Sequence, residues 1–164
     1  MNENRTSSPP AKRNPVTVER TSDRELVVTR TFNAPARLVF DAWTKPELFR
    51  RWWVPQSMDM TLHSLEMNAR TGGSYRLDFG DGMVFFDTYL EVTPHSRIVW
   101  TNDEGGQDSS VTTVTFEESD GTTLLTMTEV YPSTEALDEA GTGAADATHE
   151  TFGQLDDLLT QLLA

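Results

Sequence analysis

Residues 133–164 constrain the fold of this chain more than any other stretch, because they carry one long amphipathic helical pattern after a series of short strand-like segments. In the second half of this stretch the apolar residues recur at spacings of three and four, the period of one helix face. These residues are Phe152, Leu155, Leu158, Leu159, Leu162 and Leu163. In the first half the corresponding residues are small, namely Gly141, Gly143, Ala144, Ala145, Ala147 and Thr148. We expect a sheet to wrap this helix and the small residues to leave room for a cavity.

The length of 164 residues, with eight Phe and four Trp, suits a single domain with a sizeable core. Residues 1–23 are polar and expected to form a flexible tail, in which residues 16–19 are able to extend a first strand, and residues 24–164 form the domain. No apolar run approaches the roughly 18 residues of a membrane span, and the N-terminus lacks the apolar core of a signal peptide. A cytoplasmic protein is the default expectation. The absence of cysteine excludes disulfides, thiolate catalysis and cysteine zinc sites.

The formal net charge is −13, and no Lys or Arg follows Arg97. Such an acidic body repels phosphate backbones and anionic lipids, so we expect neither nucleic acid nor a membrane surface as a partner. The charge also has a simpler interpretation, which is solubility alone. A homodimer is compatible with the sequence, but no residue pattern selects an oligomeric state.

Two short helices are predicted between the first strand, residues 25–32, and the remaining strands. Asn33 is a suitable N-cap and Pro35 suits a first helical turn, so a helix is expected over residues 36–43. Pro46 can open a second short helix that ends near Trp52, before Pro55. Residues 58–67 are then predicted to form a strand.

The next hairpin contains Asp81 and Gly82, a dipeptide that favours two-residue turns. A turn at these residues predicts the pairs Phe79–Val84, Leu77–Phe86, Tyr75–Thr88 and Arg76–Asp87. The apolar and charged residues then separate onto opposite faces, which favours this register. Leu90 and Val92 would continue the inner face. In the strand at residues 97–102 the pattern does not decide whether Val99 or Trp100 points inward.

The last hairpin, residues 109–131, turns at Asp120 and Gly121. This turn predicts the pairs Phe116–Leu125, Val114–Met127, Thr112–Glu129 and Ser110–Tyr131. Glu129 is therefore a carboxylate on a face that otherwise carries Leu125, Met127 and Tyr131. A carboxyl group in such apolar surroundings should have a raised pKa. The alternative is a residue at a strand end that reaches solvent.

Four motifs in order resemble one protein family: RTFNAP at residues 30–35, VFDAWTKPE at 39–47, RWWVP at 51–55 and RTGGSYR at 70–76. They are similar to the signature stretches of the AHSA1-like branch of the START-like, or SRPBCC, superfamily, named after the C-terminal domain of the activator of the Hsp90 ATPase. The resemblance covers about residues 23–163 and implies the α+β helix-grip fold. In this fold a curved antiparallel sheet of about six to seven strands surrounds a long C-terminal helix, with two short helices after the first strand.

The resemblance also implies an internal cavity between sheet and long helix that takes a hydrophobic or amphipathic small molecule, without a catalytic motif. Two other functions stay open. One is cyclase, aromatase or hydratase-like catalysis, with Glu129 as the acid–base group assisted by Tyr131. The other is a protein-interaction module related to chaperone regulation, although the chain lacks the second, N-terminal domain of the eukaryotic activators. We predict no cofactor.

The residues expected to bind the ligand share an inner-face position in these predicted elements. They are Trp52, Tyr75, Leu77, Phe79, Phe86, Thr112, Met127, Glu129, Tyr131, Thr148 and Phe152. Each aromatic residue among them has a competing role as ordinary core, because large apolar side chains are mostly buried for packing. His63, His95 and His149 fall on three separate predicted segments without metal-ligand spacing, so no metal site is predicted.

Overall fold

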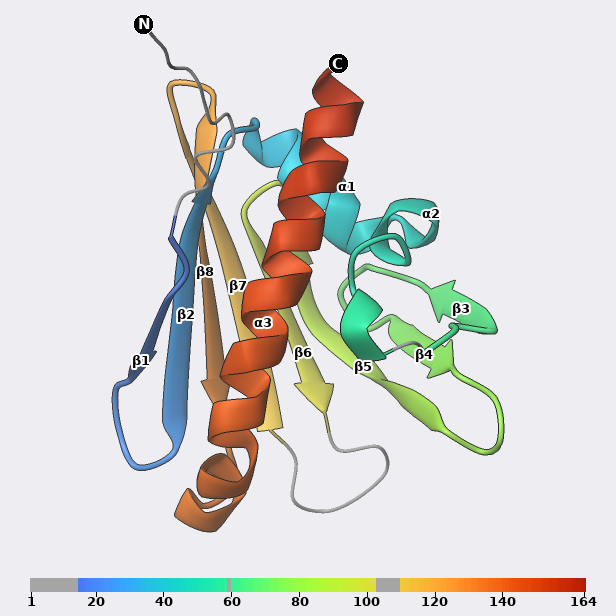
Figure 1. Cartoon of the computed structure of the whole chain (residues 1–164), viewed down its shortest axis with the longest axis vertical. Coiled ribbons are helices and arrows are strands. Elements are labelled where there is room, and N and C mark those ends of the chain that lie inside the picture. The colour runs from blue at the N-terminus through green and yellow to red at the C-terminus, as the bar shows by residue number, and fades with distance from the viewer. Residues whose placement is uncertain (1–14, 59, 103–109) are drawn as a thin grey trace, which may run out of the picture.

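The computed structural model describes residues 15–58, 60–102 and 110–164 of the chain, and in the last helix it describes the backbone but not the side chains of residues 139–147. One sheet and one long helix dominate the molecule (Figure 1). The strands are β1 (Thr17–Arg20), β2 (Glu25–Phe32), β3 (Ser64–Met67), β4 (Ser74–Asp78), β5 (Val84–Thr93), β6 (Arg97–Asn102), β7 (Ser110–Ser119) and β8 (Thr122–Val130). The helices are α1 (Ala36–Thr44), α2 (Pro46–Phe49), the 3-10 turn η2 (Gln56–Met58) and α3 (Thr134–Leu163).

The strands form a single antiparallel sheet in the order β1-β2-β8-β7-β6-β5-β4-β3. The α+β helix-grip fold is thus confirmed, with eight strands where about six to seven were expected. The additional strand is β1, which lies antiparallel to β2 with Val18 opposite Val28, because the chain turns at residues 21–24 instead of continuing straight. Residues 58–67 contribute only the short strand β3, preceded by η2.

Helix α3 crosses one face of the sheet (Figure 1). Ser133 caps its first turn, with its side-chain hydroxyl accepting a hydrogen bond from the Ala136 N–H at 3.1 Å. Of the predicted apolar stripe, the buried members are Phe152, Leu155, Leu158 and Leu159, whereas Leu162 and Leu163 are exposed. The small-residue segment from Gly141 to Ala147 belongs to this helix, but its side chains lie outside the described residues. No helix within the described part of the chain is long and apolar enough to cross a membrane.

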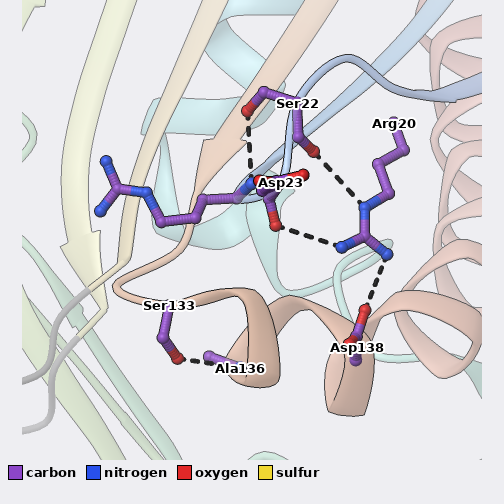
Figure 2. A network of polar contacts seen from close by, with 7 residues as sticks. Arg20, Ser22, Asp23, Ser133, Ala136 and Asp138 are labelled. Atoms are coloured by element: carbon purple, nitrogen blue, oxygen red, sulfur yellow. Dashed lines mark hydrogen bonds and ion pairs between the residues drawn. The ribbon is translucent and has the colours of Figure 1, made fainter.

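The start of α3 is tied to the turn between β1 and β2, as Figure 2 shows. The Arg20 guanidinium donates to the Asp138 carboxylate at 2.7 Å and to the Asp23 carbonyl at 3.1 Å. Both side chains of this ion pair are largely exposed, so its contribution to stability is small, about 0–1 kcal/mol. Its structural effect is to connect the added strand to the long helix.

An aromatic cluster joins α1 and α2 to the sheet and to α3. Trp43 packs edge-on against Trp52 at 4.7 Å and against Phe152 at 6.3 Å between ring centroids. Trp52 is fully buried, and its indole N–H donates to the Ala42 carbonyl at 2.8 Å. The predicted cap at Asn33 is wrong, because Pro35 is the N-cap and makes no side-chain cap bond. Instead, the Glu118 carboxylate accepts from the Ala36 N–H at 2.8 Å, so β7 supplies the missing partner.

The predicted register of the last hairpin is confirmed. Thr112 pairs with Glu129, Val114 with Met127 and Phe116 with Leu125. The turn residues Asp120 and Gly121 have φ angles of 52° and 81°, as a two-residue hairpin turn of this type requires. Tyr131 lies just beyond the end of β8.

The predicted register of the β4–β5 hairpin is wrong by one residue, because Leu77 pairs with Phe85 and not with Phe86. The loop has three residues, since Gly80 joins Asp81 and Gly82 in the left-handed region with a φ of 86°. It is closed by Phe79 N–H donating to the Met83 carbonyl at 2.9 Å. Phe86, expected in the binding site, therefore faces outward with 45% of its surface exposed.

The one-residue register shift also changes which side chains of β5 face the core. Tyr89 is buried, whereas Leu90, expected on the inner face, is exposed. A register irregularity between Tyr89 and Glu91 then returns Val92 to the core side.

Candidate functional site

An apolar cavity of about 270 Å³ lies between the β3–β6 half of the sheet and the segment that includes α1, α2 and residues 53–60. We call it the aromatic cavity. Its lining residues are Trp43, Phe49, Trp53, Val54, Pro55, Met58, Met60, Met67, Tyr75, Leu77, Phe79, Phe85, Tyr89 and Trp100. Trp43 and Phe49, from α1 and α2, line one side of it, and none of the described α3 side chains is among the lining residues.

The walls of this cavity are fixed by ring packing. Trp43 contacts Trp53 at 5.9 Å and Trp100 at 5.8 Å, and Trp53 stacks on Phe49 at 4.8 Å. These offset and edge-on arrangements are the favourable geometries for aromatic pairs. They hold the three indole rings around a space that no described side chain fills.

On the sheet side, Tyr75 and Tyr89 pack edge to face at 5.6 Å. The Tyr75 hydroxyl donates to the Thr101 carbonyl at 2.6 Å, which orients its ring. Burial raises the pKa of the Tyr89 hydroxyl above its ordinary value, so Tyr89 is neutral at physiological pH. The two phenols are the main polar groups of an otherwise apolar wall.

A second cavity of about 260 Å³ contains Glu129, and we call it the Glu129 cavity. It is lined by Trp53, Pro55, Met58, Trp100, Thr112, Met127, Glu129, Thr148, Thr151 and Phe152. Strands β7 and β8 supply its floor and α3 its opposite side. Four residues, Trp53, Pro55, Met58 and Trp100, line both cavities, so the two cavities adjoin.

Glu129 is partly buried and makes two hydrogen bonds within the described part of the chain. Its carboxylate accepts from the Thr112 hydroxyl at 3.5 Å and from the Tyr131 hydroxyl at 3.3 Å. Burial raises the pKa of the Glu129 carboxyl, and these two hydrogen bonds oppose the shift without cancelling it. Burial and the neighbouring Glu129 charge likewise raise the pKa of Tyr131. The pair can therefore exchange protons or bind polar groups, and no described ion pair involves either residue.

Residues 52–58, which contribute Trp53, Pro55 and Met58 to both cavities, are hydrogen-bonded to two side chains of α3. The Gln154 amide donates to the carbonyls of Trp52 and Val54, both at 2.9 Å, and accepts from the Gln56 N–H at 2.9 Å. The Glu150 carboxylate accepts from the Ser57 N–H at 2.9 Å and from its hydroxyl at 2.5 Å. The hydrogen bonds from Ser57 lower the pKa of Glu150. These contacts place Trp53, Pro55 and Met58 over both cavities.

The residues expected from sequence to bind a ligand divide into five groups by position. The aromatic cavity contains Tyr75, Leu77 and Phe79, and the Glu129 cavity contains Thr112, Met127, Glu129, Thr148 and Phe152. Trp52 lies in the core without lining either cavity, and Tyr131 lies behind Glu129 in a small cluster with Leu26 and Leu137. Phe86 lies on the outer face.

Several lining residues were not expected from the sequence. Phe85 and Tyr89 would have followed from the correct β4–β5 register, for which Gly80 was the available signal. Trp100 is the inward residue of β6 that the pattern left undecided. Met58 and Met60 come from irregular chain, where no periodicity predicts side-chain direction. Among the described residues no group of three or more His, Asp or Glu side chains could hold a metal ion.

Comparison with solved structures shows the same fold in several bacterial proteins. One from Rhodobacter sphaeroides has a TM-score of 0.79 at 21% identity, over 90% of this chain and 99% of that one. One from Mycobacterium smegmatis has a TM-score of 0.73 at 24% identity, over 88% and 97% of the two chains. A solution structure from Staphylococcus epidermidis has a TM-score of 0.71 at 29% identity, over 90% and 96%.

No functionally curated protein matches the chain significantly. The family model described as activator of Hsp90 ATPase homolog 1-like protein matches residues 33–164, which include every element from α1 to α3. The resemblance of the four motifs is thereby confirmed over most of the chain. This chain belongs to the family of activator of Hsp90 ATPase homolog 1-like proteins.

Proposed function

We propose that this protein binds a hydrophobic small molecule, or the hydrophobic part of an amphipathic one, in the aromatic cavity. The observation that carries the proposal is an unfilled space of about 270 Å³ lined almost entirely by aromatic and aliphatic side chains. Small-molecule sites are typically concave, apolar and furnished with a few polar groups. Tyr75 and Tyr89 are such groups.

The composition of the wall supports binding over simple core packing. Close-packed interiors leave few voids larger than a water molecule, whose share of liquid volume is about 30 Å³. The aromatic cavity is much larger than such voids and partly open to the outside, and Trp43, Trp53 and Trp100 pack against one another along its wall. Met58, Met60 and Met67 add flexible side chains that adapt to different apolar shapes.

The test is displacement of a neutral fluorescent probe, N-phenylnaphthylamine, by octanol. Leu77→Trp would fill the aromatic cavity from β4, and Leu124→Trp is its matched control on the outer face of β8, where Leu124 is 40% exposed. We expect L77W to lose probe and octanol binding and L124W to retain both.

Overpacking at Leu77 costs about 1–3 kcal/mol, so folding of the variant is checked by circular dichroism and thermal melting. If L77W does not fold, Met67→Trp, which lies at the edge of the same cavity, replaces it as the cavity-filling variant. Unchanged binding in a folded cavity-filling variant would overturn the proposal. Native mass spectrometry of protein from its own host would then identify any retained molecule.

Acid–base catalysis on the bound molecule is a second candidate function. The observation that favours it is a partly buried carboxyl group with a raised pKa, hydrogen-bonded to Tyr131 and lining a cavity that adjoins the aromatic one. Titration of Glu129 by NMR tests it. A Glu129 pKa at the ordinary carboxyl value would rule out acid–base catalysis by this residue.

A further inference from the structure

We propose that the Glu129 cavity binds a positively charged amine group of the ligand whose apolar part occupies the aromatic cavity. This inference rests on the proposed function and specifies its ligand class, a cationic amphiphile. It combines four features of the site: the size and adjacency of the cavities, the uncompensated carboxylate, the aromatic faces around it and the hydroxyl groups beside it.

The cavity volumes favour one ligand that spans both spaces. Each cavity is slightly smaller than the lower end of the range for small-molecule sites, about 300 Å³. Because Trp53 and Trp100 line both, a molecule bound in one space touches residues of the other. A ligand with an apolar end and a polar end fits this division, since the aromatic cavity offers only the Tyr75 and Tyr89 hydroxyls, whereas a carboxylate and three threonines line the Glu129 cavity.

The carboxylate of Glu129 supplies a charge that the protein does not neutralise. Among the ion pairs of the described residues none involves Glu129, and its hydrogen-bond partners are two neutral hydroxyls. The sequence contains no Lys or Arg after Arg97, so β7, β8 and α3 bring neither residue to the site, and His149 on α3 is exposed. Arg24, which directly precedes β2, donates a hydrogen bond from its guanidinium to the Pro132 carbonyl at 3.5 Å.

A buried carboxylate without a cation is costly, and an ammonium group from a ligand would offset that cost. The raised pKa of Glu129 supports this view, because the protein itself leaves the ionised form poorly stabilised. Binding of an amine would favour ionisation of Glu129. A ligand carboxylate or phosphate would have the opposite effect and would bring two negative groups together.

The surrounding rings suit a cation. Trp53, Trp100 and Phe152 line the Glu129 cavity, and the centroids of the two indoles are 6.4 Å apart at a steep angle. Cations are attracted to the faces of aromatic rings, and Trp is the strongest partner. The rings therefore offer an amine both apolar contact and favourable electrostatics.

Threonine hydroxyls complete the site. Thr112 and Thr151 are both buried, and Thr148 lies one turn before Thr151 on α3. Hydroxyl oxygens accept hydrogen bonds, which an ammonium group can only donate. The overall charge of −13 adds a long-range preference for cations over anions.

The experiment compares three ligands with the same chain, octylamine, octanol and octanoate, by isothermal titration calorimetry at neutral pH. They are measured with the unaltered protein, with Glu129→Gln and with the control Glu117→Gln. Glu117 lies exposed on the outward side of β7, so its replacement changes the net charge equally without touching the cavity.

With the unaltered protein and with E117Q, we expect octylamine to bind at least about tenfold more tightly than octanol, as a charge-assisted contact predicts. Octanoate should bind most weakly. With E129Q, the preference for octylamine should disappear, and octanol affinity should change by no more than about threefold.

Two results would overturn the inference: equal affinity of octylamine and octanol for the unaltered protein, or an equal loss of octylamine binding in E129Q and E117Q. In either case octanol binding that disappears in L77W would still support the proposed function. If none of the three ligands binds, both the proposed function and this inference fail.

Discussion

At the scale of single residues, Glu129 is the side chain whose position is least favourable for folding. Its carboxyl group lies on the face of β8 that also carries the buried Leu125 and Met127. The last hairpin was predictable from sequence because the Asp120–Gly121 turn fixes its register, and the register alone places Glu129 inside. The same register places Tyr131 next to Glu129, and its hydroxyl donates to the Glu129 carboxylate at 3.3 Å although Tyr131 lies past the end of the strand.

Replacing Glu129 with Gln should stabilise the protein in a pH-dependent way. Because the folded-state pKa of Glu129 is raised, the folded chain holds a proton that the unfolded chain releases over the pH range from the ordinary carboxyl value, 4.5, up to the raised value. Stability of the unaltered protein falls as pH rises through this window, and Gln has no such loss. The difference in free energy of unfolding between E129Q and the unaltered protein should therefore grow as the pH rises above about 4.5.

Urea unfolding at several pH values measures this difference, and E117Q again controls for the change in net charge. A difference between E129Q and the unaltered protein that stays constant over the whole pH range would contradict a raised pKa at Glu129.

At the scale of elements, the two hairpins show what turn chemistry can and cannot predict. Both contain Asp-Gly, yet the β4–β5 loop recruits Gly80 and moves the register by one residue. A side-chain bond from the Gly80 N–H to the Asp78 carboxylate, at 2.8 Å, favours this longer loop. Successive strand residues face opposite sides of the sheet, so the shift places Phe85, and not Phe86, at the wall of the aromatic cavity.

Gly80→Ala and Gly82→Ala should separate backbone strain from steric contact in this loop. Both glycines have left-handed φ angles, which cost a residue with a Cβ about 1–2 kcal/mol. A Cβ at Gly80 would lie 2.9 Å from His63 Nε2, whereas one at Gly82 would meet open space. G80A should therefore destabilise more than G82A in thermal melts, and equal losses would show that His63 moves aside freely.

The segment between α2 and β3 makes hydrogen bonds to Gln154 and Glu150 of α3, and the contribution of Gln154 yields a further prediction. Gln154→Ala removes three hydrogen bonds to residues 52–56, so the amides of this segment should exchange hydrogen faster while those of the sheet core do not. Octanol affinity should fall because Trp53 and Pro55 are held less firmly over the cavity. Gln161→Ala is the matched control, since among the described residues the Gln161 side chain bonds only the exposed Arg51 guanidinium. Equal exchange in both variants would contradict a positioning role for Gln154.

At the scale of the whole molecule, the sequence predicted the architecture well and the site in part. Periodicity and motif order were enough for the sheet, the two short helices and α3, because these patterns repeat over many residues. Trp53, Met58 and Met60 at the aromatic cavity were not predicted, because no strand or long-helix period in this segment indicates the direction of their side chains. Thr112, Met127 and Glu129 do line a common cavity because a single correct register governs all three.

The charge of the whole molecule makes its stability depend on salt. A net charge of −13 on 164 residues produces self-repulsion that favours the expanded chain. Raising the salt concentration from about 0.01 M to about 0.15 M shortens the screening length from about 30 Å to about 8 Å. The melting temperature should therefore rise over this interval in scanning calorimetry, by similar amounts in sodium chloride and choline chloride. A fall in both salts would contradict net repulsion, and a rise in sodium chloride alone would indicate a specific cation site in place of general screening.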